Sequence, residues 1–148
     1  MKTFESLDGL ESYLVGIFSQ VAFSPLFKQI ETLIKSSIDR NFKAGGRFGT
    51  GKFGGGSNQW VKSARAKTQS GQTLQDTGSM KLGVGVQVSY NSGQFNVTIT
   101  AGKVYSAAHN FGHISRPKLP ARPYLVIQDE DLEDIVELVS DYLAKQLT

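Results

Sequence analysis

The sequence has no cysteine, which excludes disulfide bonds, thiolate metal sites and cysteine nucleophiles. It also lacks the apolar run of about 18 residues that a membrane-spanning helix needs, so we expect no such span. The first residues, Met1 to Glu5, have neither the apolar stretch nor the cleavage site of a signal peptide. These absences favour a cytosolic protein whose stability comes from packing or from contacts with other copies.

The chain does have enough apolar material for one core. It contains 148 residues, of which 39% are hydrophobic and 10% aromatic, and this length is typical of one domain. We therefore predict a single domain over residues 1–148. The 16 glycines indicate that part of the chain lies outside the core.

Positive and negative charges are segregated along the chain. Residues 40–81 contain eight basic side chains and one acidic side chain, Asp76. Residues 128–148 contain seven acidic side chains and one basic side chain, Lys145. Regions of opposite charge attract either a polyanion or another copy of the same chain, and composition alone does not decide between the two.

Apolar residues recur at three- and four-residue spacing near the start of the chain, which predicts two amphipathic helices over about residues 6–42. Ser6 or Asp8 is a suitable cap for the first helix. We expect the second helix to begin at Ser24 and Pro25, with the serine as cap and the proline in the first turn.

A glycine-rich tract follows the helices, with seven glycines between residues 45 and 56. Because glycine loses the most backbone entropy on ordering, we predict a flexible, basic loop over about residues 44–73, interrupted by Trp60. A loop of this length is either a disordered insertion or a segment that orders when a partner binds. The sequence leaves both alternatives open.

The hydrophobic period changes to two after the loop. Apolar and polar residues alternate on both sides of residues 91–93, which predicts a hairpin with a three-residue connection, a type I turn and a glycine bulge. Strand-like runs at residues 103–105 and 124–127 extend the predicted sheet to about residues 80–127.

Residues 129–147 return to helical spacing, with acidic side chains in the first turns and Lys145 in the last, as the helix dipole prefers. The predicted elements together give an α+β fold. In this fold an antiparallel β-sheet packs against the N-terminal and C-terminal helices, and the long glycine-rich loop lies outside.

Few residues suggest enzymatic chemistry. His109 and His113 are four residues apart, but no third ligand is near and Gly112 argues against a helix, so we expect ordinary loop or sheet-end histidines instead of a zinc site. The glycine-rich tract lacks the sequence and context of a phosphate loop. Asp76 suits a turn or a cap better than catalysis. We therefore expect no enzymatic activity, no cofactor and no metal.

The basic loop is a candidate contact for nucleic acid, because its cations would meet phosphates and its rings would meet bases. The alternative is a solvated loop whose aromatic side chains pack back on the domain. No established nucleic-acid module frames the loop, so any contact would be without sequence preference. A nonspecific nucleic-acid-binding module is thus the alternative function.

Four short motifs occur in a fixed order. They are Gly-Gly-Ser-Asn-Gln-Trp ending at Trp60, Leu-Gln-Asp-Thr-Gly at residues 74–78, Tyr-Ser-Ala-Ala-His-Asn-Phe-Gly at residues 105–112, and Leu-Pro-Ala-Arg-Pro-Tyr-Leu at residues 119–125. In this order they resemble the phage virion morphogenesis family, which includes tail-completion proteins and the Mu-like G protein. The match spans roughly residues 27–145.

Arg122 lies between two prolines, and we expect its guanidinium to bind a carboxylate bidentately. Asp76 is one candidate partner, and the acidic C-terminal helix of this or a neighbouring copy is the other. We interpret the motif residues as scaffold instead of catalytic. The candidate interface or loop residues are Arg47, Lys52, Phe53, Trp60, Lys62, Arg65, Lys67, Asp76 and Arg122.

The resemblance implies a minor structural protein of the virion, located at the tail end or at the neck between head and tail and assembled in the cytoplasm of the bacterial host. It implies a homo-oligomeric ring, commonly hexameric, with tail tube or head connector proteins as partners. We expect each acidic helix to meet the basic region of the next subunit. The glycine-rich loop would then order against an adjacent ring or line a lumen through which DNA passes.

Overall fold

The computed structural model describes residues 6–47, 58–75, 78–91, 93–113 and 119–147. It is an α+β fold, which confirms the predicted class. Within the described part of the chain, no helix is both long and apolar enough to cross a membrane. The helices and strands are α1 (Leu7–Phe18), α2 (Ser24–Ala44), β1 (Gly46–Arg47), β2 (Asn58–Gln59), α3 (Ala64–Thr68), α4 (Ser79–Leu82), β3 (Val84–Asn91), β4 (Gln94–Ala101), α5 (Ser106–Phe111) and α6 (Asp129–Leu147).

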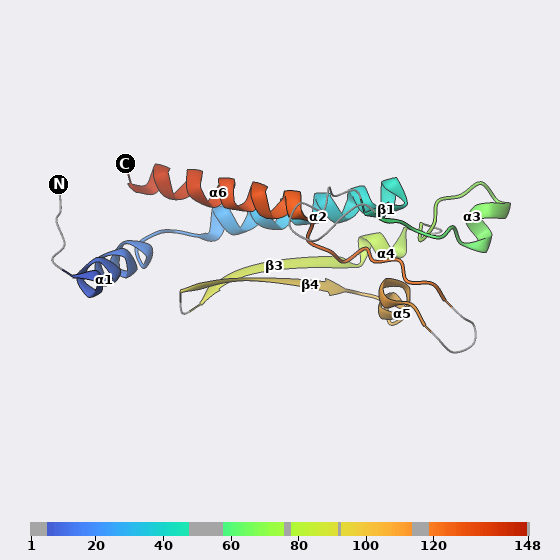
Figure 1. Ribbon diagram of the computed structural model, residues 1–148, viewed down its shortest axis with the longest axis horizontal. Coiled ribbons are helices and arrows are strands. Elements are labelled where there is room, and N and C mark those ends of the chain that lie inside the picture. The colour runs from blue at the N-terminus through green and yellow to red at the C-terminus, as the bar shows by residue number, and fades with distance from the viewer. Residues whose placement is uncertain (1–5, 48–57, 76–77, 92, 114–118, 148) are drawn as a thin grey trace.

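Helices α2 and α6 lie side by side as one layer, and the β3–β4 hairpin forms the second layer (Figure 1). The core lies mainly on one face of α2, because its apolar residues recur every four positions and so point in one direction. These residues pack with Val84 and Val88 of β3 and with the completely buried ring of Tyr124. The α2 residues of this face are Leu26, Ile30, Ile34, Ile38 and Phe42.

The two N-terminal helices begin close to the predicted positions. The Ser6 hydroxyl accepts a hydrogen bond from the backbone N–H of Gly9 at 3.2 Å, which confirms Ser6 as the cap of α1. In α2 the cap is Phe23, whereas Ser24 is already helical, so the predicted serine cap is wrong by one residue. Pro25 stands in the first turn as expected, where its missing N–H leaves no bond unmade.

The apolar stripe of α1 does not join the core. Leu7 is 83% exposed and Val15 is 61% exposed. Figure 1 shows α1 at one end of the long axis, beyond the layer formed by α2 and α6. Helical spacing in a sequence therefore predicted the helix correctly, but not what covers its apolar side.

The connection of the hairpin is one residue shorter than expected. Strands β3 and β4 pair antiparallel from Val84 opposite Ala101 to Asn91 opposite Gln94, so two residues connect them instead of three. Gly93 has a φ of +80°, a conformation that glycine adopts without steric cost. Ser92 lies outside the described residues, and with it the predicted turn type.

The predicted sheet over residues 80–127 is wrong at both ends, because residues 79–82 form α4 and residues 106–111 form α5. Residues 103–105 form a turn that the Ser106 N–H closes by donating to the Lys103 carbonyl. Residues 124–127 form no strand. The N–H groups of Tyr124 and Leu125 donate to the side-chain oxygen of Asn110, which replaces a neighbouring strand as their acceptor.

The predicted flexible loop over residues 44–73 is ordered in much of its described part. Helix α2 continues to Ala44 and ends at Gly45, whose φ of +68° suits a glycine. Strands β1 and β2 then pair, and Trp60 is buried against Phe42 with their ring centroids 5.9 Å apart. Residues 48–57, which hold most of the glycine-rich tract, lie outside the described residues.

Candidate functional site

Three of the four motifs contribute to one cavity of about 360 Å³. Leu74 and Gly78 come from the segment before α4, Tyr105 and His109 from the start of α5 and its next turn, and Arg122 from the segment before α6. Residues 76 and 77, which include the candidate Asp76, lie outside the described residues. Segments far apart in sequence therefore meet at a site lined by aromatic, cationic and apolar side chains.

Arg122 is the most buried cation of this cavity, with 4% of its surface exposed. Its Nε donates to the carbonyl of Val61 at 2.8 Å, and its backbone N–H donates to the carbonyl of His109 at 2.8 Å. The described lining of the cavity contains no carboxylate, and burial lowers the pKa of the guanidinium. The described contacts of Arg122 are thus carbonyls, and within this chain α6 supplies it no described carboxylate; the candidate partner Asp76 lies outside the described residues, and a carboxylate from a neighbouring copy stays a prediction.

His109 lies in α5 and not in the predicted loop or sheet end. The helix ends at Gly112, where φ is +79° and a Cβ would approach the backbone nitrogen of Ala121 to 2.9 Å. Burial lowers the pKa of His109, and the positive charge of Arg122 lowers it further. Among the described residues, no three His, Cys, Asp or Glu side chains gather to hold a metal ion.

The described residues of the motif that ends at Trp60 do not line the cavity, but a hydrogen bond joins this motif to the one at residues 119–125. The indole N–H of Trp60 donates to the carbonyl of Pro123 at 3.1 Å, and the Asn110 side chain accepts from the N–H groups of Tyr124 and Leu125 at 2.9 and 3.0 Å. Asn110 was not singled out from the sequence, although it lies inside the third motif. These contacts tie residues 119–125 to two distant segments.

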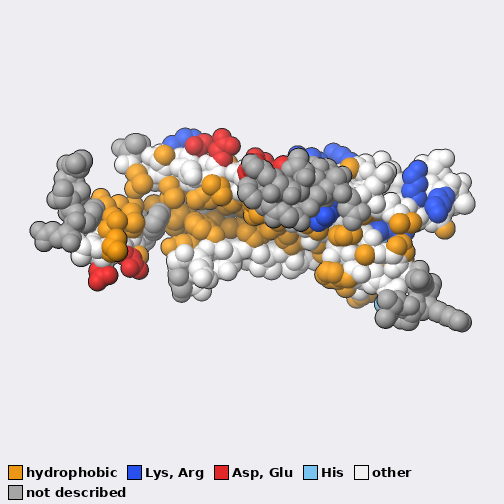
Figure 2. Space-filling view, in the orientation of Figure 1, with side chains coloured by type: hydrophobic (Ala, Val, Ile, Leu, Met, Phe, Trp, Pro, Cys, Tyr) orange, Lys and Arg blue, Asp and Glu red, His pale blue; other side chains and the backbone are white. Residues whose placement is uncertain are grey.

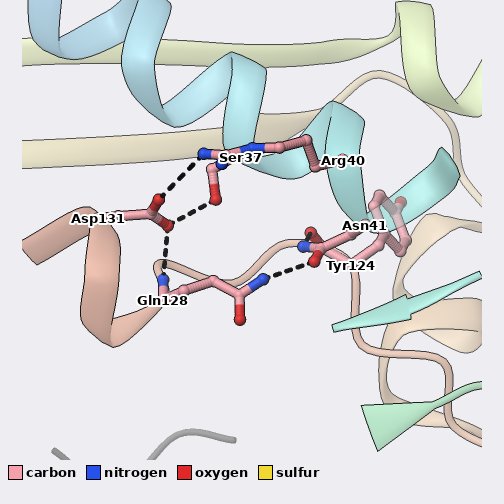
Figure 3. A network of polar contacts seen from close by, with 6 residues as sticks. All are labelled: Ser37, Arg40, Asn41, Tyr124, Gln128 and Asp131. Atoms are coloured by element: carbon pink, nitrogen blue, oxygen red, sulfur yellow. Dashed lines mark hydrogen bonds and ion pairs between the residues drawn. The ribbon is translucent and has the colours of Figure 1, made fainter. Parts of the chain in front are cut away.

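A buried polar network continues from this region to the start of α6 (Figure 3). Asp131 is completely buried, and one of its oxygens accepts from the Ser37 hydroxyl at 2.6 Å and from the Gln128 N–H at 2.7 Å. Arg40 lies 3.9 Å from the other oxygen. Burial raises the pKa of Asp131, whereas these three groups oppose the rise. The network fixes the start of α6 against α2.

The acidic helix divides its charges between the interior and the surface. Asp129 and Asp131 are buried, so they add nothing to the surface that the charge count predicted. Leu132 and Val136 are 46% and 65% exposed and form an apolar strip beside Glu133 and Glu137. The exposed acidic residues of α6 are Glu133, Asp134, Glu137 and Asp141.

The basic region is divided in the same way. Lys43 and Lys81 both pair with Asp39, at 3.3 and 2.7 Å, and Arg40 pairs with Asp131. Lys62 and Lys67 are exposed next to and within α3. Figure 2 shows basic side chains at the α3 end of the molecule, and acidic ones along the α6 side, where basic side chains also lie, and at the α1 end.

Of the remaining candidates that the structure describes, Arg65 lines the same cavity as Arg122, whereas Arg47 and Trp60 do not. Arg47 is half-buried in β1, and Trp60 is buried, so its ring is not available to stack on bases. Arg65 is half-buried in α3 and donates to the carbonyl of Gln72 at 2.8 Å. Lys52 and Phe53 lie outside the described residues.

We compared the chain with protein families, with curated proteins and with solved structures. The model of the phage virion morphogenesis family matches residues 8–144. The Mu-like prophage FluMu G protein 2 of Haemophilus influenzae is 28% identical over 123 residues, which cover 80% of this chain and 77% of that protein. No solved structure matches. The family match covers all four motifs, and the chain therefore belongs to the phage virion morphogenesis family and has a role in phage morphogenesis.

Proposed function

We propose that the protein is a non-enzymatic minor structural component that completes the tail or joins head to tail. In this proposal copies of the chain form a closed ring at the tail end or neck, with tail tube or head connector proteins as neighbours. In this proposal the motif cavity keeps the segments of each subunit together and takes no part in chemistry, since Arg122 in its lining binds the Val61 carbonyl.

The observation that supports ring assembly is the placement of the two exposed charged surfaces on separate elements. The acidic surface runs along α6, whereas the basic surface surrounds α3 at one end of the long axis (Figures 1 and 2). A contact between unlike surfaces is heterologous, and repeated contacts of this kind close into a ring when the rotation allows. Exposed Leu132 and Val136 add apolar area at the centre of the acidic surface.

Charge-swapped variants test this contact. Glu133→Lys/Glu137→Lys replaces two of the four exposed acidic residues of α6 by lysines, and Lys62→Glu/Lys67→Glu replaces the two exposed lysines at α3 by glutamates. Each double variant should form far less ring by light scattering after gel filtration, because like charges then face each other. An equimolar mixture should restore the ring, since each altered surface meets its complement in alternating subunits.

The matched control is Glu11→Lys, which changes an exposed acidic residue of α1 and should leave the ring intact. Parent chain that stays monomeric at high concentration, or a mixture no better than its components, would contradict the proposal. In infected cells, loss of the protein should leave unjoined heads and incomplete tails by electron microscopy. Normal particles without it would exclude the proposed joining role.

A further inference from the structure

The β3–β4 hairpin has two outer edges, and the register defines the backbone groups on each. The N–H of Gly102 donates to the carbonyl of Gly83 at 2.8 Å, which makes these residues a hydrogen-bonded pair. Such pairs alternate along an antiparallel ladder with pairs whose polar groups point outward. In β4 the residues with outward N–H and C=O groups are therefore Phe95, Val97, Ile99 and Ala101.

The outer edge of β3 is protected. The outward N–H of Val88 donates to the carboxylate of Glu31 on α2 at 3.0 Å, as the alternation requires. Helix α2 also packs along β3, which carries buried Val84 and Val88. A further strand at this edge would have to displace both the carboxylate and the helix.

The outer edge of β4 has no such protection. Figure 1 shows β4 as the outermost element of the layer on this side, and β4 pairs with no other described strand. Its eight residues, Gln94 to Ala101, include no charged residue and no proline. Natural proteins use such residues to prevent pairing at exposed edges, so an unprotected edge of this length indicates an interaction surface.

We propose that β4 pairs antiparallel with β4 of a second copy, in the register that places Thr98 opposite Thr98 on a two-fold axis. In this register Val97 lies opposite Ile99 of the second copy, and Phe95 lies opposite Ala101 of the second copy. All four outward residues of each strand then pair with outward residues of the other, and each such pair exchanges two backbone hydrogen bonds.

The side chains also fit a second copy better than a charged partner. Phe95 is 41% exposed and packs against Phe23 at a centroid distance of 5.5 Å, and small Ala101 opposite it leaves space for the ring. Val97 and Ile99 are β-branched residues that pack well as cross-strand neighbours. Because β4 is uncharged, two identical strands approach without repulsion, and the marginal two-stranded sheet becomes four-stranded.

This contact is isologous and differs from the α6–α3 contact proposed above, so either can fail without the other. Its test therefore uses the Glu133→Lys/Glu137→Lys background, in which the helix contact is absent. Any remaining self-association is then measured by sedimentation velocity over a range of concentrations.

Thr98→Lys and Thr98→Glu place like charges directly opposite each other on the two-fold axis. Each variant alone should self-associate at least about tenfold more weakly, since like charges at a closely spaced pair are destabilising. An equimolar mixture should recover the association, because lysine then faces glutamate. Ser89→Lys, at an exposed position of β3 away from the β4 edge, is the matched control and should change nothing.

Amide hydrogen exchange gives a second readout that needs no substitution. The N–H groups of Val97 and Ile99 should exchange more slowly as the concentration rises, whereas that of Val88, already bonded to Glu31, should not change. A background chain that stays monomeric, a lysine–glutamate mixture that fails to recover, or concentration-independent exchange at Val97 would each overturn the proposal.

Discussion

Asp131 has the largest structural role of any single acidic residue described. It lies in the acidic C-terminal run, yet it is completely buried and accepts from Ser37 and Gln128. Because the Gln128 N–H directly precedes α6, the carboxylate also caps that helix. A residue that counts as surface charge in the sequence is thus part of the interior in the fold.

Replacing this carboxylate should destabilise the fold strongly. Asp131→Ala leaves the Ser37 hydroxyl and the Gln128 N–H buried without their acceptor and is expected to lower the free energy of unfolding by about 2–4 kcal/mol. Urea denaturation followed by circular dichroism measures the loss. Exposed Asp134→Ala is the control and should stay within about 0.5 kcal/mol of the parent. Equal effects of the two variants would contradict the assigned role.

Asp39 makes the stability of the fold depend on pH at low pH. Its hydrogen bond with Lys81 is the main reason that the pKa of Asp39 lies below the ordinary value of an aspartate, and Lys43 lowers it further. A lowered folded-state pKa contributes stability above the unfolded pKa, and this stability is lost as the pH falls through the folded value.

The stability difference between the parent and Asp39→Asn should therefore be present at pH 7 and be lost as the pH falls through the lowered folded-state pKa of Asp39. We expect it to be below about 1 kcal/mol and smaller in high salt, because the pair is partly exposed. Thermal unfolding at several pH values measures it, with Lys28→Met as an exposed control. A difference that does not change with pH would exclude the ion pairs as its source.

At the scale of elements, the long helices and the hairpin were predictable because their hydrophobic periods are local. Residues 124–127 were not, because a strand-like pattern says nothing of whether another strand or Asn110 will accept its N–H groups. The ordering of residues 58–73 likewise depends on Trp60 meeting Phe42 and Pro123, contacts between distant segments. The sequence singled out Trp60 and Arg122, but their partners depend on the fold.

The role of the Asn110 side chain as acceptor for the N–H groups of Tyr124 and Leu125 can be tested directly. Asn110→Ala removes the acceptor of two N–H groups and should lower the free energy of unfolding by about 2–3 kcal/mol. Asn110→Asp keeps an acceptor oxygen and should lose less. Chemical denaturation compares the two variants, and equal losses would mean that volume, not hydrogen bonding, matters at this site.

The whole molecule has one helix that contributes little to its core. Removal of residues 1–19 deletes all of α1 but keeps Ala22, whose carbonyl accepts from the Tyr142 hydroxyl. The shortened chain should melt within about 2 °C of the parent, because the deleted apolar residues are largely exposed. Calorimetry measures the change. A much lower melting temperature would show that α1 packs on the rest of the chain.

The hydrogen bond of Glu31 to β3 affects how many copies of the hairpin can pair edge to edge. A hairpin with two open edges would add copies indefinitely and grow into a fibre, whereas a hairpin sealed along β3 stops after one partner. The Glu31 carboxylate and α2 together thus limit strand pairing by this hairpin to one partner strand. Glu31→Ala removes only the carboxylate, so the chain should still form no thioflavin-positive filaments as long as α2 covers the β3 edge.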